Sequence, residues 1–202
     1  PPFGRMIDPH GGKLVQQFSN DQIDHPICEV KVNEEIYSDS FQIANGTFSP
    51  VNAFMNYEQM ESVLNENSIN DSVSWTMPII FQINKNMVDK IPGSGTIYLK
   101  KANDDHPYGI LDINKIEKLK NKNKLVKLWF GTDDESHPGV SKFLSSGDFI
   151  ISGKPFILKN YIGSAQNKYE LTPIQSRFVF DHNGWHNVVG FHTRNVPHLG
   201  HE

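Results

Sequence analysis

The sequence contains 202 residues and has a net charge of -4 with a pI near 6.1. This length suits one compact domain plus part of a second, and a hydrophobic content of 37% is enough to form a core. Because the chain is slightly acidic, it has no general attraction to nucleic acid or to an anionic membrane. Any anion-binding site must therefore be local.

Cys28 is the only cysteine, which excludes an internal disulfide framework, and we expect its side chain to be buried as a small hydrophobic group. No segment approaches the roughly 20 apolar residues that a transmembrane helix needs. The N-terminus also lacks the apolar region of a signal peptide. We therefore predict a soluble, cytoplasmic protein with no membrane partner.

Up to about residue 165 the chain consists of short apolar runs broken by Gly, Pro, Asn and Asp. This pattern predicts a mostly β domain with a few short helices. The clearest predicted strands are 75–83, 95–100, 108–113 and 147–153. Their turn-rich connections are typical of a small β-barrel.

The best predicted helix in this part of the chain spans 56–67, where Asn56 can cap the helix and Gln59 can complete a capping box. The lysine-rich run 113–127 could suggest a nucleic-acid patch. Leucines interrupt it and no aromatic residues are interleaved, so we interpret it as a solvated face.

The pattern changes after residue 165. Thr172 can cap a helix, Pro173 fits its first position, and Gln175 can complete a second capping box before Gly184 ends the helix. The run 186–191, HNVVGF, is nearly all apolar and predicts a strand covered on both faces, as in a parallel sheet. A second, α/β domain is therefore expected to begin here.

Polar groups follow this predicted strand, at the edge where open α/β sheets bind ligands. Arg194 and Asn195 provide hydrogen-bond donors for an anion. If a helix begins near Pro197, His198 and His201 share one of its faces, and its N-terminal NH groups favour phosphate. The His spacing alone is common by chance, but together these features indicate a nucleotide site.

The stretch HTRNVPHLGHE resembles the signature of ATP sulfurylase, which commonly is Q-x-R-N-P-x-H-x-x-H, within the H-x-G-H nucleotidyltransferases. Three further stretches are similar to successive landmarks of that family: IDPHGGKLV, NGTFSPVNAFMN and GTDDESHPGV. The segment LTPIQSRFVFDHNGWHNVVGFHTRN is another landmark and overlaps the signature. The resemblance implies a PUA-like β-barrel domain over 1–168 and the start of a Rossmann-like α/β nucleotidyltransferase domain over 169–202.

The resemblance also implies roles for individual residues. Thr193, Arg194 and Asn195 correspond to the active-site loop that binds sulfate and the ATP phosphates, and His198 and His201 to the pair that stabilises the transition state. The sequence departs from the family at His192, where Gln is usual. It also has Val196 and then Pro197 where Pro and then a variable residue are usual.

The implied reaction joins sulfate to ATP and yields adenosine 5′-phosphosulfate and pyrophosphate. Magnesium enters as MgATP, so no protein-bound metal is expected, and a homo-oligomer is expected for the full-length enzyme. The family's second phosphate-binding loop has no counterpart here. We therefore expect the chain to be the front portion of a longer enzyme, inactive alone and at best a weak nucleotide binder.

Two other classes of function stay open. A non-catalytic PUA-like module could bind RNA or protein, although the charge and the lack of aromatic interleaving argue against RNA. A metal-binding β-barrel could use several of the nine histidines. His10 and His137 lie in Pro-Gly turns that favour structural hydrogen bonds. The remaining candidates are His106 beside Asp104 and Asp105, and His182 with His186, which Gly184 separates.

Overall fold

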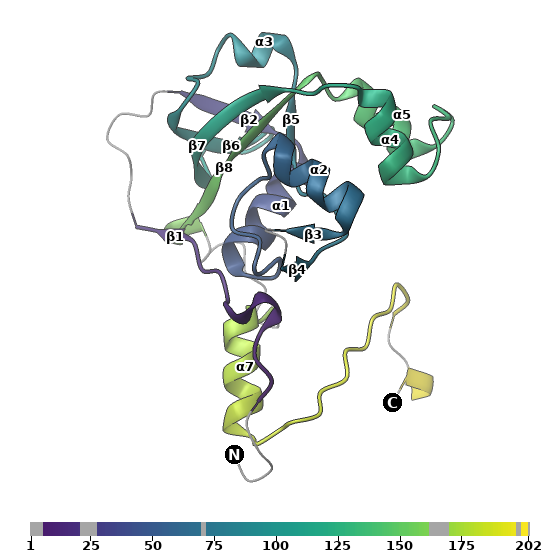
Figure 1. The fold of residues 1–202 in the computed structure, drawn as a ribbon. Coiled ribbons are helices and arrows are strands. Elements are labelled where there is room, and N and C mark those ends of the chain that lie inside the picture. Colours follow the sequence, from purple (N-terminus) through teal and green to yellow (C-terminus); the bar gives the residue numbers. More distant parts are fainter. Residues whose placement is uncertain (1–5, 21–27, 70–71, 162–169, 197–198, 202) are drawn as a thin grey trace.

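The computed structural model describes residues 6–20, 28–69, 72–161, 170–196 and 199–201. Figure 1 shows a sheet with helices packed around it, and below this body the helix α7 (Pro173–His182) followed by an extended C-terminal segment. The order of elements is mixed from the start, since helices alternate with strands along the chain.

One six-stranded mixed sheet forms the body, in the order β1-β8-β7-β6-β2, with β5 also pairing to β8. The pairs β1/β8 and β2/β6 are parallel, and the other pairs are antiparallel. Its strands are β1 (Phe18–Ser19), β2 (Glu29–Val32), β5 (Phe81–Ile83), β6 (Gly95–Lys101), β7 (Gly109–Lys118) and β8 (Phe149–Leu158). Beside it lies a small ribbon of β3 (Ser68–Ile69) and β4 (Val73–Ser74).

Strand β8 organises the sheet because both of its edges are used. One edge pairs with β7 along its length, with a bulge between Ile113 and Lys115. The other edge is shared by β5, by an isolated bridge between Phe54 and Gly153, and by β1. A Cβ on Gly153 would lie 2.5 Å from the carbonyl oxygen of Asp112, so this crowded position requires glycine.

The predicted strands 95–100, 108–113 and 147–153 are confirmed as β6, β7 and β8. Only the last three residues of 75–83 form a strand, since Pro78 has no N–H to donate to a ladder. The predicted barrel is wrong, because the sheet of the described strands ends at β1 and β2, which do not pair with each other.

The prediction of a mostly β domain is also wrong, because helices occupy more of the described residues than strands do. The helices are α1 (Glu34–Asn45), α2 (Tyr57–Glu66), α3 (Lys85–Val88), α4 (Lys122–Phe130), α5 (Pro138–Ser145) and α7 (Pro173–His182). Asn56 caps α2 and forms the predicted capping box with Gln59. None of the helices in the described ranges is long and apolar enough to cross a bilayer.

Two apolar clusters hold the body together. The larger one packs α1, through Ile36 and Ile43, against strands β2 and β5 to β8. Cys28 is half-buried at its margin, and burial raises the pKa of its thiol. The smaller cluster joins α2, α4 and α5 to β8 through Met60, Leu125 and Ile150. Burial of these apolar side chains is the main stabilising contribution to the helical layer.

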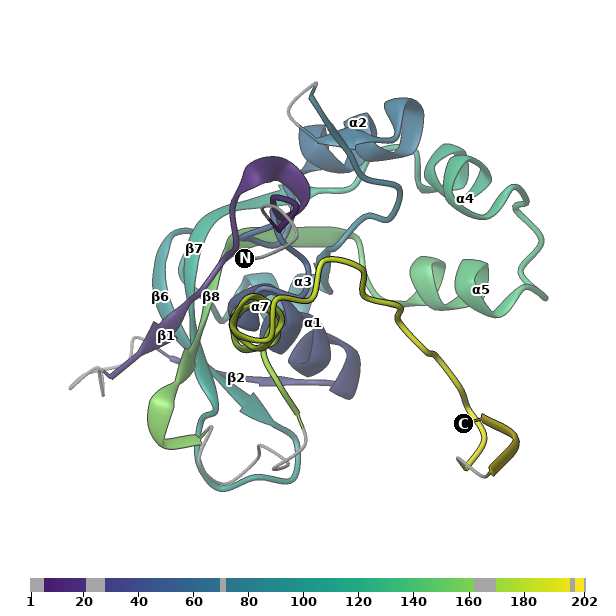
Figure 2. The same ribbon diagram turned by 90° about the horizontal axis from the view of Figure 1, so that it is seen from below.

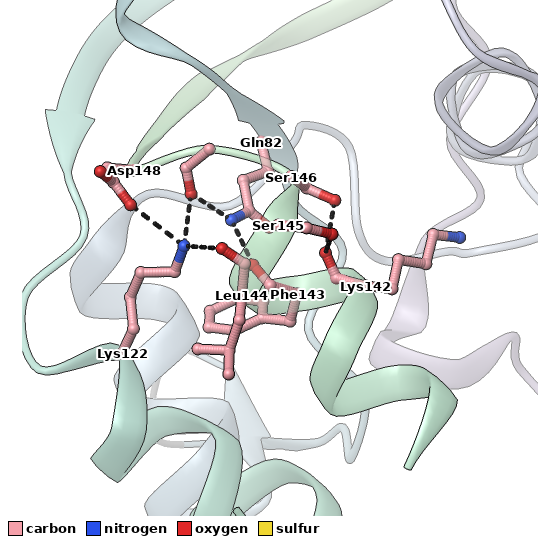
Figure 3. A network of polar contacts seen from close by, with 9 residues as sticks. Gln82, Lys122, Lys142, Phe143, Leu144, Ser145, Ser146 and Asp148 are labelled. Atoms are coloured by element: carbon pink, nitrogen blue, oxygen red, sulfur yellow. Dashed lines mark hydrogen bonds and ion pairs between the residues drawn. The ribbon is translucent and has the colours of Figure 1, made fainter. Parts of the chain in front are cut away.

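Polar contacts also fasten α5 to its neighbours, as Figure 3 shows. The Lys122 ammonium, at the start of α4, donates to the carbonyls of Leu144 and Gly147, each at 2.7 Å. It also lies 3.1 Å from the Asp148 carboxylate. The Gln82 amide, from β5, donates to the carbonyls of Phe143 at 2.8 Å and Gly147 at 2.5 Å. A cation thus lies at the C-terminal end of α5, where it interacts favourably with the helix dipole.

Candidate functional site

Helix α7 leads into the segment that the sequence predicts to bind anions. Thr172 caps it, Pro173 occupies its first turn, and Gln175 completes the capping box, all as predicted. Gly184 follows the helix with a φ of 68°, so the predicted stop is also confirmed. None of the residues of α7 is buried. In Figures 1 and 2 the helix lies beneath α1 and points away from the sheet.

The N-terminal segment connects α7 to the body. The Arg177 guanidinium donates to the Ile7 carbonyl, and the His10 imidazole Nε2 donates to the Ser74 carbonyl at 2.8 Å. Gly11 has a φ of +68°, and a Cβ there would lie 2.5 Å from the Pro50 ring. Figure 1 shows this segment beside α7. The predicted structural role of His10 is thereby confirmed.

The predicted strand 186–191 is not formed, and this prediction is wrong for the described chain. The residues are extended, but Asn187 to Gly190 make no backbone hydrogen bond with another described residue. Val189 is 90% and Phe191 65% exposed, where burial on both faces was expected. The reason is non-local: a parallel strand needs neighbouring strands, and none of the described strands lies beside this segment.

A local turn follows at Thr193–Asn195. The Asn195 N–H donates to Thr193 Oγ1 at 3.0 Å, and the same hydroxyl donates to the Asn195 carbonyl at 3.3 Å. Thr193 is half-buried, whereas His192, Arg194 and Asn195 are exposed. Within the described part of the chain, the side chains of Arg194 and Asn195 form no hydrogen bond or ion pair. Both therefore keep their donors available for an anion.

The structure describes only part of the predicted histidine pair. Pro197 and His198 lie outside the described residues, as does the side chain of His201. The backbone of Leu199–His201 forms a short 3-10 turn. The structure therefore brings Thr193 to Asn195 together in one turn, and the placement of the two histidines against that turn stays a prediction.

Exposed apolar side chains gather in the same part of the chain. Of the twelve large hydrophobic residues exposed among the described ones, nine lie between 171 and 199. They are Leu171, Ile174, Phe178, Trp185, Val188, Val189, Phe191, Val196 and Leu199. Apolar surface on this scale is typical of a region that another part of a protein covers.

The other histidines and the lysine run have mainly structural contacts. His137 caps α5, with Nδ1 accepting from the N–H groups of Gly139 and Val140, so its predicted structural role is confirmed. The prediction that the lysine-rich run is a solvated face is wrong for Lys122, whose side chain is only 14% exposed. Within the described residues, no three His, Cys, Asp or Glu side chains gather as a metal site.

Two features that the sequence did not predict involve α1. A cavity of about 570 Å³ lies between α1 and the residues before α7, lined by Phe41, Gln42 and Leu171 among others. Burial raises the pKa of the Asp39 carboxyl to about 6, and the Glu35 carboxylate adds to this rise while Lys142 opposes it. Lys142 lies near Asp39 only because α5 approaches α1 in space. The spacing of these residues along the sequence therefore did not predict their interaction.

Comparison with known proteins classifies the chain. The family model of the PUA-like domain matches residues 7–160, which is more than half of the chain. The chain belongs to the PUA-like domain family. The ATP-sulfurylase family model matches residues 167–202, directly after the PUA-like domain.

Curated relatives agree with both matches. The sulfate adenylyltransferase of Pyrococcus abyssi is 34% identical over 203 residues, covering 96% of this chain and 51% of the relative. That of Ignicoccus hospitalis is 34% identical over 202 residues, covering 96% of this chain and 52% of the relative. The resemblance to ATP sulfurylase is confirmed, and the chain spans about half the length of these relatives.

A solved structure supports the fold. A chain of the hexameric APS kinase from Thiobacillus denitrificans superposes with a TM-score of 0.61 at 16% identity. The match covers 89% of this chain and 32% of that one. It therefore includes most of the PUA-like domain, and at this identity it establishes the arrangement of the backbone alone.

Proposed function

We propose that this chain is the PUA-like domain and the first catalytic segment of a sulfate adenylyltransferase. The observation that carries the proposal is the turn at Thr193–Asn195, with Arg194 and Asn195 exposed, inside the segment 167–202 that matches the ATP-sulfurylase family. Arg194 and Asn195 present exposed donors there, as sites for sulfate and phosphate require. The relatives' names give the reaction class.

The proposed reaction transfers AMP from MgATP to sulfate, or runs in reverse, without a covalent intermediate. Sulfate is already an anion and needs no general base, so the protein's task is to hold two mutually repelling anions together. Arg194 offers a charged fork, Asn195 an amide and His192 one ring N–H. His198 and His201 are proposed to stabilise charge on the α-phosphoryl group or on pyrophosphate. Each well-aimed donor contributes about 3 kcal/mol to such a transition state.

The catalytic domain is proposed to begin near residue 169 and to need more residues than this chain contains. The exposed apolar run that includes Val188 and Val189 supports this, since a strand of an α/β domain requires neighbours on both sides. The coverage of about half of each relative agrees with it. On this proposal the chain alone has no turnover, and the complete enzyme is a cytoplasmic homo-oligomer.

The direct test is sulfate-dependent release of pyrophosphate from MgATP by the full-length natural protein containing this chain. Arg194→Ala should lower kcat/KM by about 100- to 1,000-fold. Arg194→Lys should recover only part of this, because lysine keeps the charge but not the planar fork. Lys124→Ala, on the exposed face of α4, is the matched control and should leave the rate unchanged. No release by a folded wild-type protein would refute the proposal.

A further inference from the structure

The hydroxyl of Thr193 is engaged within its own turn rather than directed at solvent. It accepts the Asn195 N–H at 3.0 Å, within the normal range for such a bond, and it lies 3.3 Å from the Asn195 carbonyl as a donor. A threonine hydroxyl has one hydrogen to donate. In this geometry the Asn195 carbonyl is the acceptor within reach of that hydrogen.

Sulfate and phosphate oxygens accept hydrogen bonds, so a side chain that binds them must donate. The Thr193 hydroxyl could donate to such an oxygen only by leaving the Asn195 carbonyl. Arg194 and Asn195 differ in this respect, because their side-chain donors are exposed and not engaged by other described residues. Within the turn, Thr193 therefore shapes the backbone, whereas Arg194 and Asn195 can contact an anion.

We infer that Thr193 is a positioning residue, which fixes the turn presenting Arg194 and Asn195, and that it does not itself bind the substrate anions. A side-chain oxygen that accepts the N–H two residues later is a recurrent means of fixing a short loop. This inference rests on the proposed function for its catalytic consequence, and it changes the role that the family resemblance implies for Thr193. The geometry of the turn itself does not depend on the reaction.

The test compares Thr193→Val, which keeps the shape and removes the hydroxyl, with Thr193→Ser, which keeps the hydroxyl. In the full-length protein without substrates, hydrogen exchange of the Asn195 amide should be about fivefold faster in the valine variant. It should be unchanged in the serine variant. With substrates, valine should lower kcat/KM for both sulfate and MgATP by about 10- to 100-fold, because Arg194 and Asn195 are misplaced together. Serine should restore the rate.

The two readouts keep this inference separate from the proposed function. An inactive wild-type protein would refute the function, while the exchange rate of the Asn195 amide would still test the turn. An unchanged exchange rate in the valine variant would overturn the positioning role. An active wild-type protein whose valine variant loses affinity for sulfate alone, with the exchange rate unchanged, would instead identify Thr193 as a direct sulfate ligand.

Discussion

Replacing Lys122 with methionine should destabilise the protein by about 2–3 kcal/mol. The substitution keeps an apolar stem of similar length but removes the ammonium group, with its polar contacts (Figure 3) and its position 5.6 Å from the centre of the Phe143 ring. Two of the polar contacts are bonds of 2.7 Å to the Leu144 and Gly147 carbonyls, and hydrogen bonds to a charged group contribute about 1.5–3 kcal/mol each. Gly147 keeps its bond to Gln82, so only the Leu144 carbonyl loses its side-chain partner. The expected loss in the free energy of unfolding is therefore smaller than the sum of two such bonds.

The ion pair between Lys122 and Asp148 should contribute little to stability, which provides a control. Asp148 is 63% exposed, and an exposed ion pair contributes at most about 1 kcal/mol. Asp148→Asn should therefore cost much less than Lys122→Met. Lys124→Met, on the same helix but exposed and without a partner among the described residues, should change stability by less than about 0.5 kcal/mol.

Urea unfolding, monitored by circular dichroism, gives the free energy of unfolding for each variant. A double-mutant cycle with Gln82→Leu sharpens the test, because the Gly147 carbonyl loses both partners only in the double variant. The double loss should exceed the sum of the single losses. A Lys122→Met protein as stable as the wild type, or an Asp148→Asn protein equally destabilised, would refute the assignment of the stabilisation to the carbonyl bonds.

Four further substitutions have predicted effects on the stability of the protein or of α7. Burial raises the pKa of Asp39 to about 6. The stability that Asp39 contributes through its protonated form is therefore complete below about pH 4 and is lost as the pH rises through 6. Asp39→Asn should therefore gain about 1 kcal/mol at pH 8, after allowance for solvent screening, and nothing at pH 4, as measured by urea unfolding at both pH values. Gly147→Ala should cost more than about 3 kcal/mol, because φ is +118° and the new Cβ would lie 2.2 Å from the Ile83 carbonyl oxygen. Gly12→Ala, with φ +78° and open space, should cost about 1 kcal/mol in the same assay. Thr172→Ala should shorten α7 and reduce its helical signal in NMR chemical shifts, since loss of an N-cap costs about 1 kcal/mol; unchanged shifts would contradict this.

The elements that depend on local interactions could be predicted from the sequence. Both capping boxes, Asn56 with Gln59 and Thr172 with Gln175, are confirmed because a cap is formed by residues three apart. Strands β6, β7 and β8 are confirmed because apolar runs bounded by turn residues permit few alternatives. These features need no knowledge of the rest of the fold.

The helices that cover the sheet could not be predicted in the same way. Helix α1 contains Ser38 and Ser40, which are weak helix formers, and packing of Ile36 and Ile43 against the sheet decides its conformation. Its N-cap, Asn33, was a local signal that sequence reasoning missed. Barrel closure also depends on how far the whole sheet curls, which the pattern within one strand does not encode.

In the candidate site, too, some features could be predicted from the sequence, and others depend on backbone geometry or on the rest of the fold. A turn rich in donors was expected after residue 191, and the exposed Arg194 and Asn195 fit that expectation. The bond that shapes the turn, from the Asn195 N–H to Thr193, depends on backbone geometry and was not predicted. The strand before it was predicted from its apolar residues, but an apolar run becomes a strand only beside other strands.

Hydrogen exchange tests whether segment 186–191 becomes a strand when more of the protein is present. In the 202-residue chain, the amides of Asn187 to Gly190 form no backbone hydrogen bond with another described residue, so they should exchange at rates close to those of an unfolded peptide. In the full-length natural protein the same amides should be protected by several orders of magnitude, because a central strand pairs on both edges. The α2 amides, already bonded in this chain, provide the internal control and should be equally protected in both proteins. Equal, rapid exchange of Val188 and Val189 in both proteins would show that this segment does not become a strand, and it would contradict the proposed start of an α/β domain at residue 169.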